Sequence, residues 1–306
     1  GEGGEPPLER PTEVPYDECD HLLELRAHQR SEPGDQTPYQ VPIDNDHYQC
    51  FEFKTPWVDA VHGLAFSPLI DDDRVLHHWL LYGQNGGAED GRSRGCAGQH
   101  DDANLLAGWA PGGGAWIMPE GVGLQLPHGD DAFFVLEVHY NNAAGHQDAA
   151  DRSGVEVCAT NQPRQEEAAV HWLGTELILL AGDGAHEITG RCNPNSEEPI
   201  HILSTWPHMH RRGRHMQMTI HRSDGRTESL VDHPFDFNNQ VGYWTPSTLL
   251  PGDSVETICT FENSGGLAHF GPNTENEMCY NFVVAYPAGA LSNGRGFAGD
   301  RNFCLF

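Results

Sequence analysis

Apolar residues along this chain come in short runs, and Gly, Pro, Asn or Asp residues bound each run. This pattern is typical of β-strands joined by turns, and turn signals such as Ser223 to Arg226 lie between the runs. The spacing predicts an all-β protein of the sandwich type. Helical periodicity is confined to residues 20–30, which predict one short helix. The strands that we expect span residues 48–53, 75–82, 132–140, 154–160, 200–206, 215–221, 254–261 and 279–286.

Two changes in composition divide the chain. Residues 1–15 (GEGGEPPLERPTEVP) contain almost nothing to bury and predict a disordered leader. Residues 160–167 (TNQPRQEE) are polar and separate two strand-rich halves. We therefore expect one β-sandwich domain over residues 16–166 and a second over residues 167–306.

The charge balance limits the possible partners. Lys and Arg total 17 against 45 Asp and Glu, a net charge of -28 with neutral histidines. A polyanion of this density repels phosphate backbones, so nucleic acid and anionic membrane surfaces are poor candidates. No apolar run approaches the roughly 20 residues that a membrane span needs. The sequence does not define the oligomeric state.

The cysteines indicate the compartment. Eight cysteines are scattered along the chain, and none forms a C-x-x-C pair of the kind found in zinc ribbons. Scattered cysteines in even number are typical of disulfides formed in an oxidising compartment. We expect a secreted, periplasmic or cell-surface protein. Spacing alone leaves about 105 pairings open.

Nineteen histidines are present, and those of the first half suggest a metal site. His77 and His78 are adjacent in one expected strand, where neighbouring side chains point to opposite faces. Both can reach one metal only at a strand end or a distortion such as a bulge. His139 ends another apolar strand, where a hydrogen-bonded core histidine is the ordinary alternative to a ligand.

The second half carries a stronger signal. His208 and His210 are two positions apart, so a strand would present both imidazoles on one face while Met209 points away. Two histidines on a wet strand face are the alternative. Met278 could supply a thioether, a soft ligand suited to Cu(I), although methionine is usually a core residue.

Four motifs occur in one order along the chain: HHWLLYG from His77, EVHY around His139, H-x-H from His208 followed by Gly213 and Arg214, and EMC around Met278. In this arrangement the chain resembles the copper type II, ascorbate-dependent monooxygenases. That family includes peptidylglycine alpha-hydroxylating monooxygenase and dopamine beta-monooxygenase. The resemblance covers nearly the whole chain, from about Cys19 to Cys304.

The resemblance implies two jelly-roll-like β-sandwiches that face each other across a wet cleft, each with one copper ion. His77, His78 and His139 match the copper that stores and delivers an electron. The set His208, His210 and Met278 matches the copper that binds dioxygen and attacks the substrate. Ascorbate would reduce both ions, and the reaction would convert a C–H bond into an alcohol and release water. The pairing that we expect by this resemblance is Cys19–Cys158, Cys50–Cys96, Cys192–Cys304 and Cys259–Cys279.

The residues expected to bind the substrate differ from those of the peptide hydroxylase. That enzyme has an arginine two residues before H-x-H that binds the substrate carboxylate, and Trp206 stands at this position here. Tryptophan cannot form a bidentate clamp, so a C-terminal glycine peptide is disfavoured. Glu137 and the negative field of the chain favour a cationic substrate such as an amine. We expect Glu137, Trp206, Tyr280 and Phe282 to line the substrate site.

The sequence is consistent with three functions. The first is an exported copper monooxygenase that hydroxylates a small molecule. The second is a non-catalytic copper-binding or copper-buffering protein that keeps the ligands without turnover. The third is a zinc hydrolase with three histidine ligands, which leaves Met278 and the H-x-H pair without a role.

Overall fold

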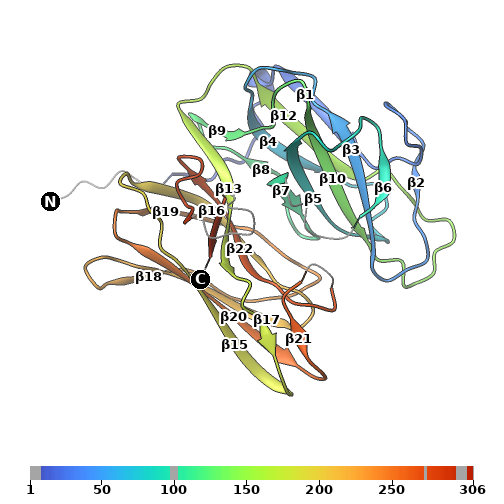
Figure 1. The fold of residues 1–306 in the computed structure, drawn as a ribbon. Coiled ribbons are helices and arrows are strands. Elements are labelled where there is room, and N and C mark those ends of the chain that lie inside the picture. Colours follow the sequence, from blue (N-terminus) through green and yellow to red (C-terminus); the bar gives the residue numbers. More distant parts are fainter. Residues whose placement is uncertain (1–7, 97–102, 272–273, 294–301, 306) are drawn as a thin grey trace.

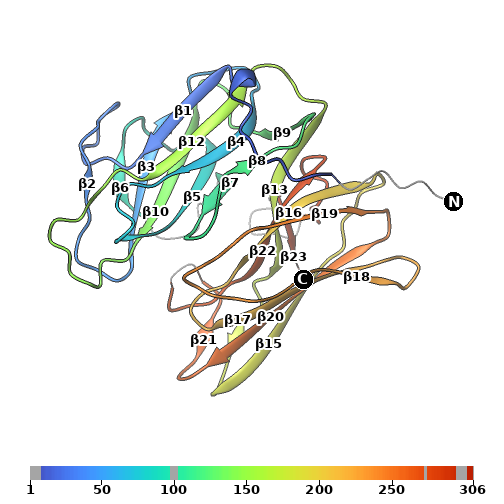
Figure 2. The same ribbon diagram turned by 180° about the vertical axis from the view of Figure 1, so that it is seen from behind.

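The structure is a computed structural model that describes residues 8–96, 103–271, 274–293 and 302–305. Across these residues the chain is built of β-strands, and its helical content is the 3-10 turn η1 (Tyr16–Glu18). Figures 1 and 2 show two lobes, one of blue to green strands and one of yellow to red strands. The all-β fold class is therefore confirmed.

The first lobe consists of two antiparallel layers. The first layer contains, in spatial order, β6 (Ser93–Gly95), β3 (His47–Lys54), β10 (Ala132–Tyr140), β5 (Leu76–Asn85) and β7 (Ala103–Trp109). The second layer contains β1 (His21–Arg26), β12 (Gly154–Thr160), β4 (His62–Leu69) and β9 (Val122–Gln125), with β8 (Trp116–Ile117) paired to β4. Buried side chains of both layers, including Phe51, Trp79, Phe66 and Val157, form one core.

The second lobe has the same two-layer plan. One layer contains β13 (Glu166–Thr175), β22 (Cys279–Tyr286), β16 (Ile200–His208) and β19 (Tyr243–Leu249), with β23 (Phe303–Leu305) paired to β13. The other contains β15 (Gly184–Cys192), β20 (Ser254–Asn263), β17 (Gly213–His221) and β18 (Thr227–Pro234). Two short ribbons complete the described strands: β2 (Tyr39–Gln40) with β11 (Ala150–Asp151), and β14 (Leu179–Leu180) with β21 (Ala268–His269).

The lobes are joined through β13. Its first residues pair in parallel with β9, Glu166 opposite Val122 and Ala168 opposite Leu124, while the rest of the strand pairs with β22. One hydrogen-bonded sheet thus continues from the first lobe into the second. The expected boundary between residues 166 and 167 falls at the start of this strand.

The strands predicted from the apolar runs are all present, as β3, β5, β10, β12, β16, β17, β20 and β22. The helix predicted over residues 20–30 is wrong, because residues 21–26 form β1 and pair with β12 along their whole length. Leu25 is buried against the core while Leu22 is half exposed. Cross-strand pairing therefore overrides the local preference, as is common for short segments.

Four disulfides join the cysteines: Cys19–Cys158, Cys50–Cys96, Cys192–Cys304 and Cys259–Cys279. This is the pairing implied by the resemblance, and every bridge stays within one lobe. Four disulfides indicate that the chain folds in an oxidising compartment.

Of the leader expected over residues 1–15, the structure describes residues 8–15, which have no helix or strand. This segment contacts the second lobe, since Trp244 Nε1 donates a hydrogen bond to the Leu8 carbonyl at 3.1 Å. Residues 1–7 lie outside the described residues. Within the described residues, no helix has the length and apolar character needed to cross a membrane.

Candidate metal centre

A β-bulge brings His77 and His78 to the same site. His139 on β10 lies opposite His78 on β5, but the next residue, Tyr140, lies opposite Leu76, so His77 is the extra residue. A bulge re-aims the side chains beside it, which lets two adjacent histidines turn toward one point. The distortion that the adjacent pair requires is therefore present.

The three imidazoles of the first lobe form a compact buried group. One ring nitrogen each of His77, His78 and His139 lies within 4.8 Å of the others, and the Nδ1 atoms of His77 and His78 are 3.0 Å apart. His139 is 1% exposed, and its Nδ1 has no hydrogen-bond partner among the described residues. A buried nitrogen without a partner costs free energy unless a further group binds it, so it suits a metal ligand.

The outer nitrogens of this group are held by residues around it. His139 Nε2 lies 2.8 Å from Asp46 Oδ1, and Thr274 Oγ1 donates to the same oxygen at 2.7 Å. The Tyr48 ring stacks on His139 at 4.1 Å with an angle of 5°. Carboxylates placed in this way fix the orientation of ligand histidines and raise their basicity. Although burial opposes it, hydrogen bonds from His139 and Thr274 lower the pKa of Asp46.

The second lobe supplies a partner to the first. His77 Nε2 lies 3.2 Å from Asn238 Oδ1, and the His77 ring packs against Phe237 at 5.0 Å. Burial lowers the pKa of His77 to about 4 and that of His78 well below its usual value, with nearby histidines as further causes. Both rings are therefore neutral at pH 7, the form that binds a metal ion.

The register of β16 and β22 places the second set of candidate ligands. His208 lies opposite Tyr280, and Trp206 lies opposite Phe282. If the antiparallel register is extended by two residues past His208, His210 lies opposite Met278. Both residues are just beyond the ends of their strands. His208, His210 and Met278 then share one face.

Two nearby groups hold the histidines of this second set. His208 Nδ1 lies 2.8 Å from Gln240 Oε1, and His210 Nδ1 lies 3.2 Å from the Asn276 carbonyl. With Nδ1 as the donor in each ring, Nε2 is the nitrogen that would meet a metal. Burial lowers the pKa of His208 to about 4, so its ring is neutral at pH 7.

Glu277 fixes the turn that carries His210. Its carboxylate is fully buried and accepts backbone hydrogen bonds from His210 at 3.0 Å and Arg212 at 2.8 Å. Because Glu277 directly precedes Met278, the same residue positions both sides of the candidate site.

The two sets meet at one cavity of about 30 Å³, to which the first lobe contributes His78 and Glu137. The second lobe contributes His208, His210 and Met278 to the same lining. This volume holds roughly two waters. The resemblance implied a wet cleft between the lobes, whereas at this point the structure has a water-sized cavity.

The residues expected to line a substrate site are in different places. Glu137 and Phe282 face the shared cavity, and Trp206 lines two neighbouring cavities. Tyr280 lies in the core, where its hydroxyl donates to Glu176 Oε1 at 2.7 Å. Its ring is fully buried, so it supports the site from behind.

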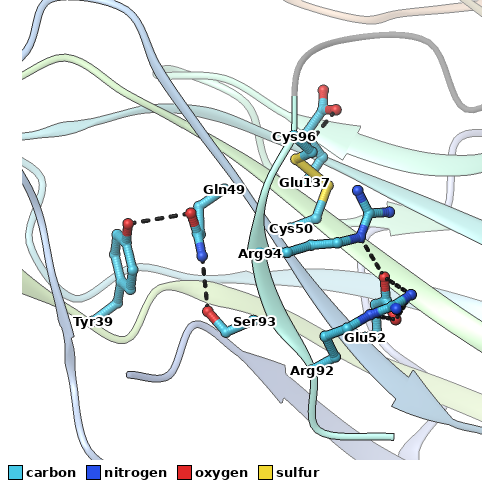
Figure 3. Close-up of a disulfide and its surroundings, with 9 residues drawn as sticks. All are labelled: Tyr39, Gln49, Cys50, Glu52, Arg92, Ser93, Arg94, Cys96 and Glu137. Carbon is cyan, nitrogen blue, oxygen red and sulfur yellow. Dashed lines mark hydrogen bonds and ion pairs between the residues drawn. A yellow bond between two sulfur atoms is a disulfide. The ribbon is translucent and has the colours of Figure 1, made fainter. Parts of the chain in front are cut away.

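Glu137 lies beside the Cys50–Cys96 disulfide, with Cys96 Sγ 3.9 Å from Glu137 Oε2 (Figure 3). These residues are close enough to resemble a metal group. Because both sulfurs are bonded to each other, they are not available as thiolate ligands. Figure 3 also shows Glu52 bound by Arg92 and Arg94, which ties β6 to β3 beside this disulfide.

The sequence reading missed the supporting residues Asp46, Phe237, Asn238, Gln240 and Glu277. Most lie in loops or turns, and their roles depend on contacts made across the fold. The one available signal is the acidic residue directly before Met278 in the EMC motif.

The donor sets fit copper. Neutral imidazoles bind both Cu(I) and Cu(II), and a thioether is a soft donor that favours Cu(I). The fold and the two candidate sets define an all-β, two-lobed protein with three histidines in one lobe and a His/His/Met set in the other. Comparison with known families is consistent with this class.

The chain belongs to the copper type II ascorbate-dependent monooxygenase family. The model of the family's N-terminal domain matches residues 35–147, and that of its C-terminal domain matches residues 166–295. The zinc hydrolase hypothesis therefore has no support.

Curated relatives have names from the same family. DBH-like monooxygenase protein 1 of Gallus gallus is 30% identical over 279 residues, which cover 81% of this chain and 45% of that protein. Peptidyl-glycine alpha-amidating monooxygenase A of Xenopus laevis is 26% identical over 258 residues, covering 81% of this chain and 27% of that protein. The chain thus spans less than half of each of these relatives. Among solved structures, that of allantoicase covers 74% of this chain and 81% of its own at 10% identity, and its TM-score of 0.24 carries no argument.

Proposed function

We propose that this chain is a copper-dependent monooxygenase that hydroxylates a C–H bond of a small molecule, using dioxygen and ascorbate. His77, His78 and His139 would hold one copper, and His208, His210 and Met278 would hold the other. When bound, the two ions supply one-electron chemistry with dioxygen. The observation that carries the proposal is that His78 of the first set lines one cavity together with His208, His210 and Met278 of the second.

The chain's own residues prepare this site. Burial keeps His77 and His208 neutral, so neither must lose a proton before binding a metal at pH 7. Asp46 and Gln240 each hold the outer nitrogen of one histidine, which fixes the tautomer that faces the metal. Phe237 packs against His77 and lies 6.5 Å from His210, so one apolar ring is close to both sets.

An amine is the substrate class that we favour. Trp206 replaces the carboxylate-binding arginine of the peptide hydroxylase, and Glu137 contributes a buried carboxyl group to the shared cavity. A carboxyl group beside the ligands suits a cationic substrate better than an anionic one. The disulfides support action outside the cytosol, as a secreted, periplasmic or cell-surface protein.

One observation favours a second candidate function, a copper-binding or copper-buffering protein without turnover. The cavity at the ligands has a volume of about 30 Å³, which is small for a pocket that holds an organic substrate. A copper-binding protein without turnover needs no larger space.

Ascorbate-dependent oxygen consumption by the copper-loaded chain distinguishes the two. Amines, peptides and aromatic compounds are offered in parallel, and hydroxylated product is measured by mass spectrometry. The enzyme hypothesis predicts product with wild type and with His186→Ala, which changes a histidine outside both sets. It predicts no product with His208→Ala. Tight copper binding without product from any class supports the buffer.

A further inference from the structure

A second cavity lies where the two lobes meet, outside the shared cavity of the ligands. Its volume is about 140 Å³, several times that of the cavity at the histidines. The first lobe contributes the segment from Gly108 to Met118, and the second contributes Trp206 and the segment from Gln240 to Trp244. This volume matches a small organic molecule better than a few waters.

Indole rings form part of the lining, beside polar groups. Four tryptophans line the cavity, and all but the buried Trp206 are partly exposed: Trp109, Trp116, Trp206 and Trp244. The rings of Trp116 and Trp206 are 5.8 Å apart and tilted by 36°, so the two lobes contribute adjoining aromatic surfaces. Tyr243 adds a further ring to the lining.

Every one of these indole N–H groups is already used within the protein. Trp109 donates to the Gly113 carbonyl at 2.8 Å, and Trp116 donates to that of Gly108 at 3.0 Å. Trp206 donates to the Gln240 carbonyl at 2.8 Å, and Trp244 to that of Leu8 at 3.1 Å. None of these tryptophans therefore has a free N–H group to donate to an occupant, and aromatic surface is what remains.

The ring faces are held rigidly. The edge of Trp206 lies so close to β7 that a Cβ atom on Gly108 would come within 1.8 Å of the ring. Only glycine fits at this position. Such rigid aromatic walls favour binding, because little side-chain freedom is lost when a ligand enters.

From these observations we infer that this cavity binds a small organic cation of the alkylammonium class. Indole faces attract a cation through the ring quadrupole, and tryptophan is the strongest of the aromatic side chains in this role. The net charge of -28 draws cations to the protein. Among the described lining residues the charged side chain is the exposed Arg10, whose positive charge opposes the binding of a cation.

The cavity is also linked to the candidate metal centre. Trp116 and Trp206 line a small space of about 10 Å³ together with Phe282, and Phe282 lines the cavity of the ligands. Gln240 accepts from Trp206 through its backbone and pairs with His208 through its side chain. The inference concerns binding alone, and it holds whether or not the chain turns over a substrate.

Titration of the metal-free chain with choline, followed by calorimetry and tryptophan fluorescence, tests the inference. The matched probe is 3,3-dimethylbutan-1-ol, which has nearly the same shape without the charge. We expect saturable choline binding and affinity for the neutral probe that is weaker by about tenfold. Equal affinity for both probes, or no saturable choline binding, would overturn the inference.

Variants locate the site. Trp116→Leu and Trp244→Leu should each weaken choline binding about fivefold or more, whereas Trp244→Phe, which keeps a ring face, should lose less. Tyr16→Leu removes an exposed aromatic ring elsewhere and should change nothing. Arg10→Ala should leave choline binding equal or tighter. The circular dichroism spectrum shows whether each Leu variant is folded. Unchanged choline affinity in both folded Leu variants would contradict the assignment, and so would weaker choline binding in Arg10→Ala.

Discussion

The buried carboxylate of Glu277 accepts a hydrogen bond from the backbone N–H of His210 at 3.0 Å. It accepts a second from Arg212 at 2.8 Å, and both partners lie in the turn that follows β16. Glu277 itself directly precedes Met278, and β22 begins at the next residue, Cys279. One side chain thus sets the position of the H-x-H turn relative to the methionine strand.

Replacement of this carboxylate should therefore damage one metal set selectively. Glu277→Ala leaves two backbone donors without their acceptor, which should cost about 1–3 kcal/mol for each donor that stays buried. Copper should bind more weakly at the His/His/Met set and normally at the three-histidine set. Urea unfolding and copper competition titrations measure the two effects. Equal loss at both sets would show that Glu277 acts on the whole fold.

Asp46 offers the complementary test in the other lobe. Asp46→Asn removes the charge beside His139 Nε2, and loss of such an outer partner usually lowers metal affinity about 10–100-fold. The affected site should be the three-histidine set. Copper competition with a chelator measures the change, and Asp59→Asn, an exposed acidic residue of the same lobe, is the control. An Asp46→Asn protein with wild-type copper affinity would contradict the role given to Asp46.

The acid stability of the metal-free chain should depend on His171. This residue is fully buried on β13, and its Nε2 accepts a hydrogen bond from the Gly289 N–H at 3.2 Å. Burial lowers its pKa to about 4, so the unfolded chain binds a proton more readily than the folded chain. The stabilisation is then complete above the unfolded pKa of about 6.5 and is lost as the pH falls toward 4.

The variant His171→Gln keeps an acceptor and cannot take up this proton. Between pH 6.5 and 4, wild type should lose up to roughly 3 kcal/mol more stability than the variant. Urea unfolding at several pH values measures both slopes. Because His77, His78 and His208 titrate in both proteins, the difference isolates His171. Parallel slopes would mean that His171 is not held neutral.

The disulfide beside Met278 should support the second metal set. Cys259 and Cys279 close a loop with a sequence separation of 20, and a bridge over such a loop stabilises a protein by about 3 kcal/mol. The double variant Cys259→Ala, Cys279→Ala should lose about this much and should bind copper more weakly at the His/His/Met set. Removal of Cys19–Cys158 should lower stability without changing that set. The opposite pattern would exclude a local role for the bridge.

The sequence predicted the architecture well where strands carry apolar runs. Strands β10, β12 and β22 have the predicted bounds, because both of their faces are largely buried and most of their residues are apolar. It missed β15 and β18, whose exposed faces are polar and whose runs are therefore interrupted, and it also missed β4, β7 and β13, which are largely buried. The segment of β1 was misread because its partner, β12, lies more than 100 residues away in sequence.

The candidate ligands were predicted because their chemistry is visible in residue types and spacing. The residues that hold these ligands in place could not be predicted. Asp46 contacts His139, and Asn238 contacts His77, only because the fold brings distant segments together. The position of Tyr280 also depends on the fold, since its hydroxyl donates to Glu176 in the core. Motifs thus identify donors, whereas their partners require tertiary contacts.

The most direct test of the two-copper account is carbon monoxide binding to the reduced, copper-loaded chain, combined with the copper count. Wild type should hold two coppers and bind carbon monoxide at the His/His/Met set. Met278→Ile, a change of similar volume that should cost less than about 1.5 kcal/mol, should lose carbon monoxide binding with the fold intact. His139→Ala should lose one copper and keep carbon monoxide binding. Carbon monoxide binding that responds to His139→Ala and not to Met278→Ile would contradict the account.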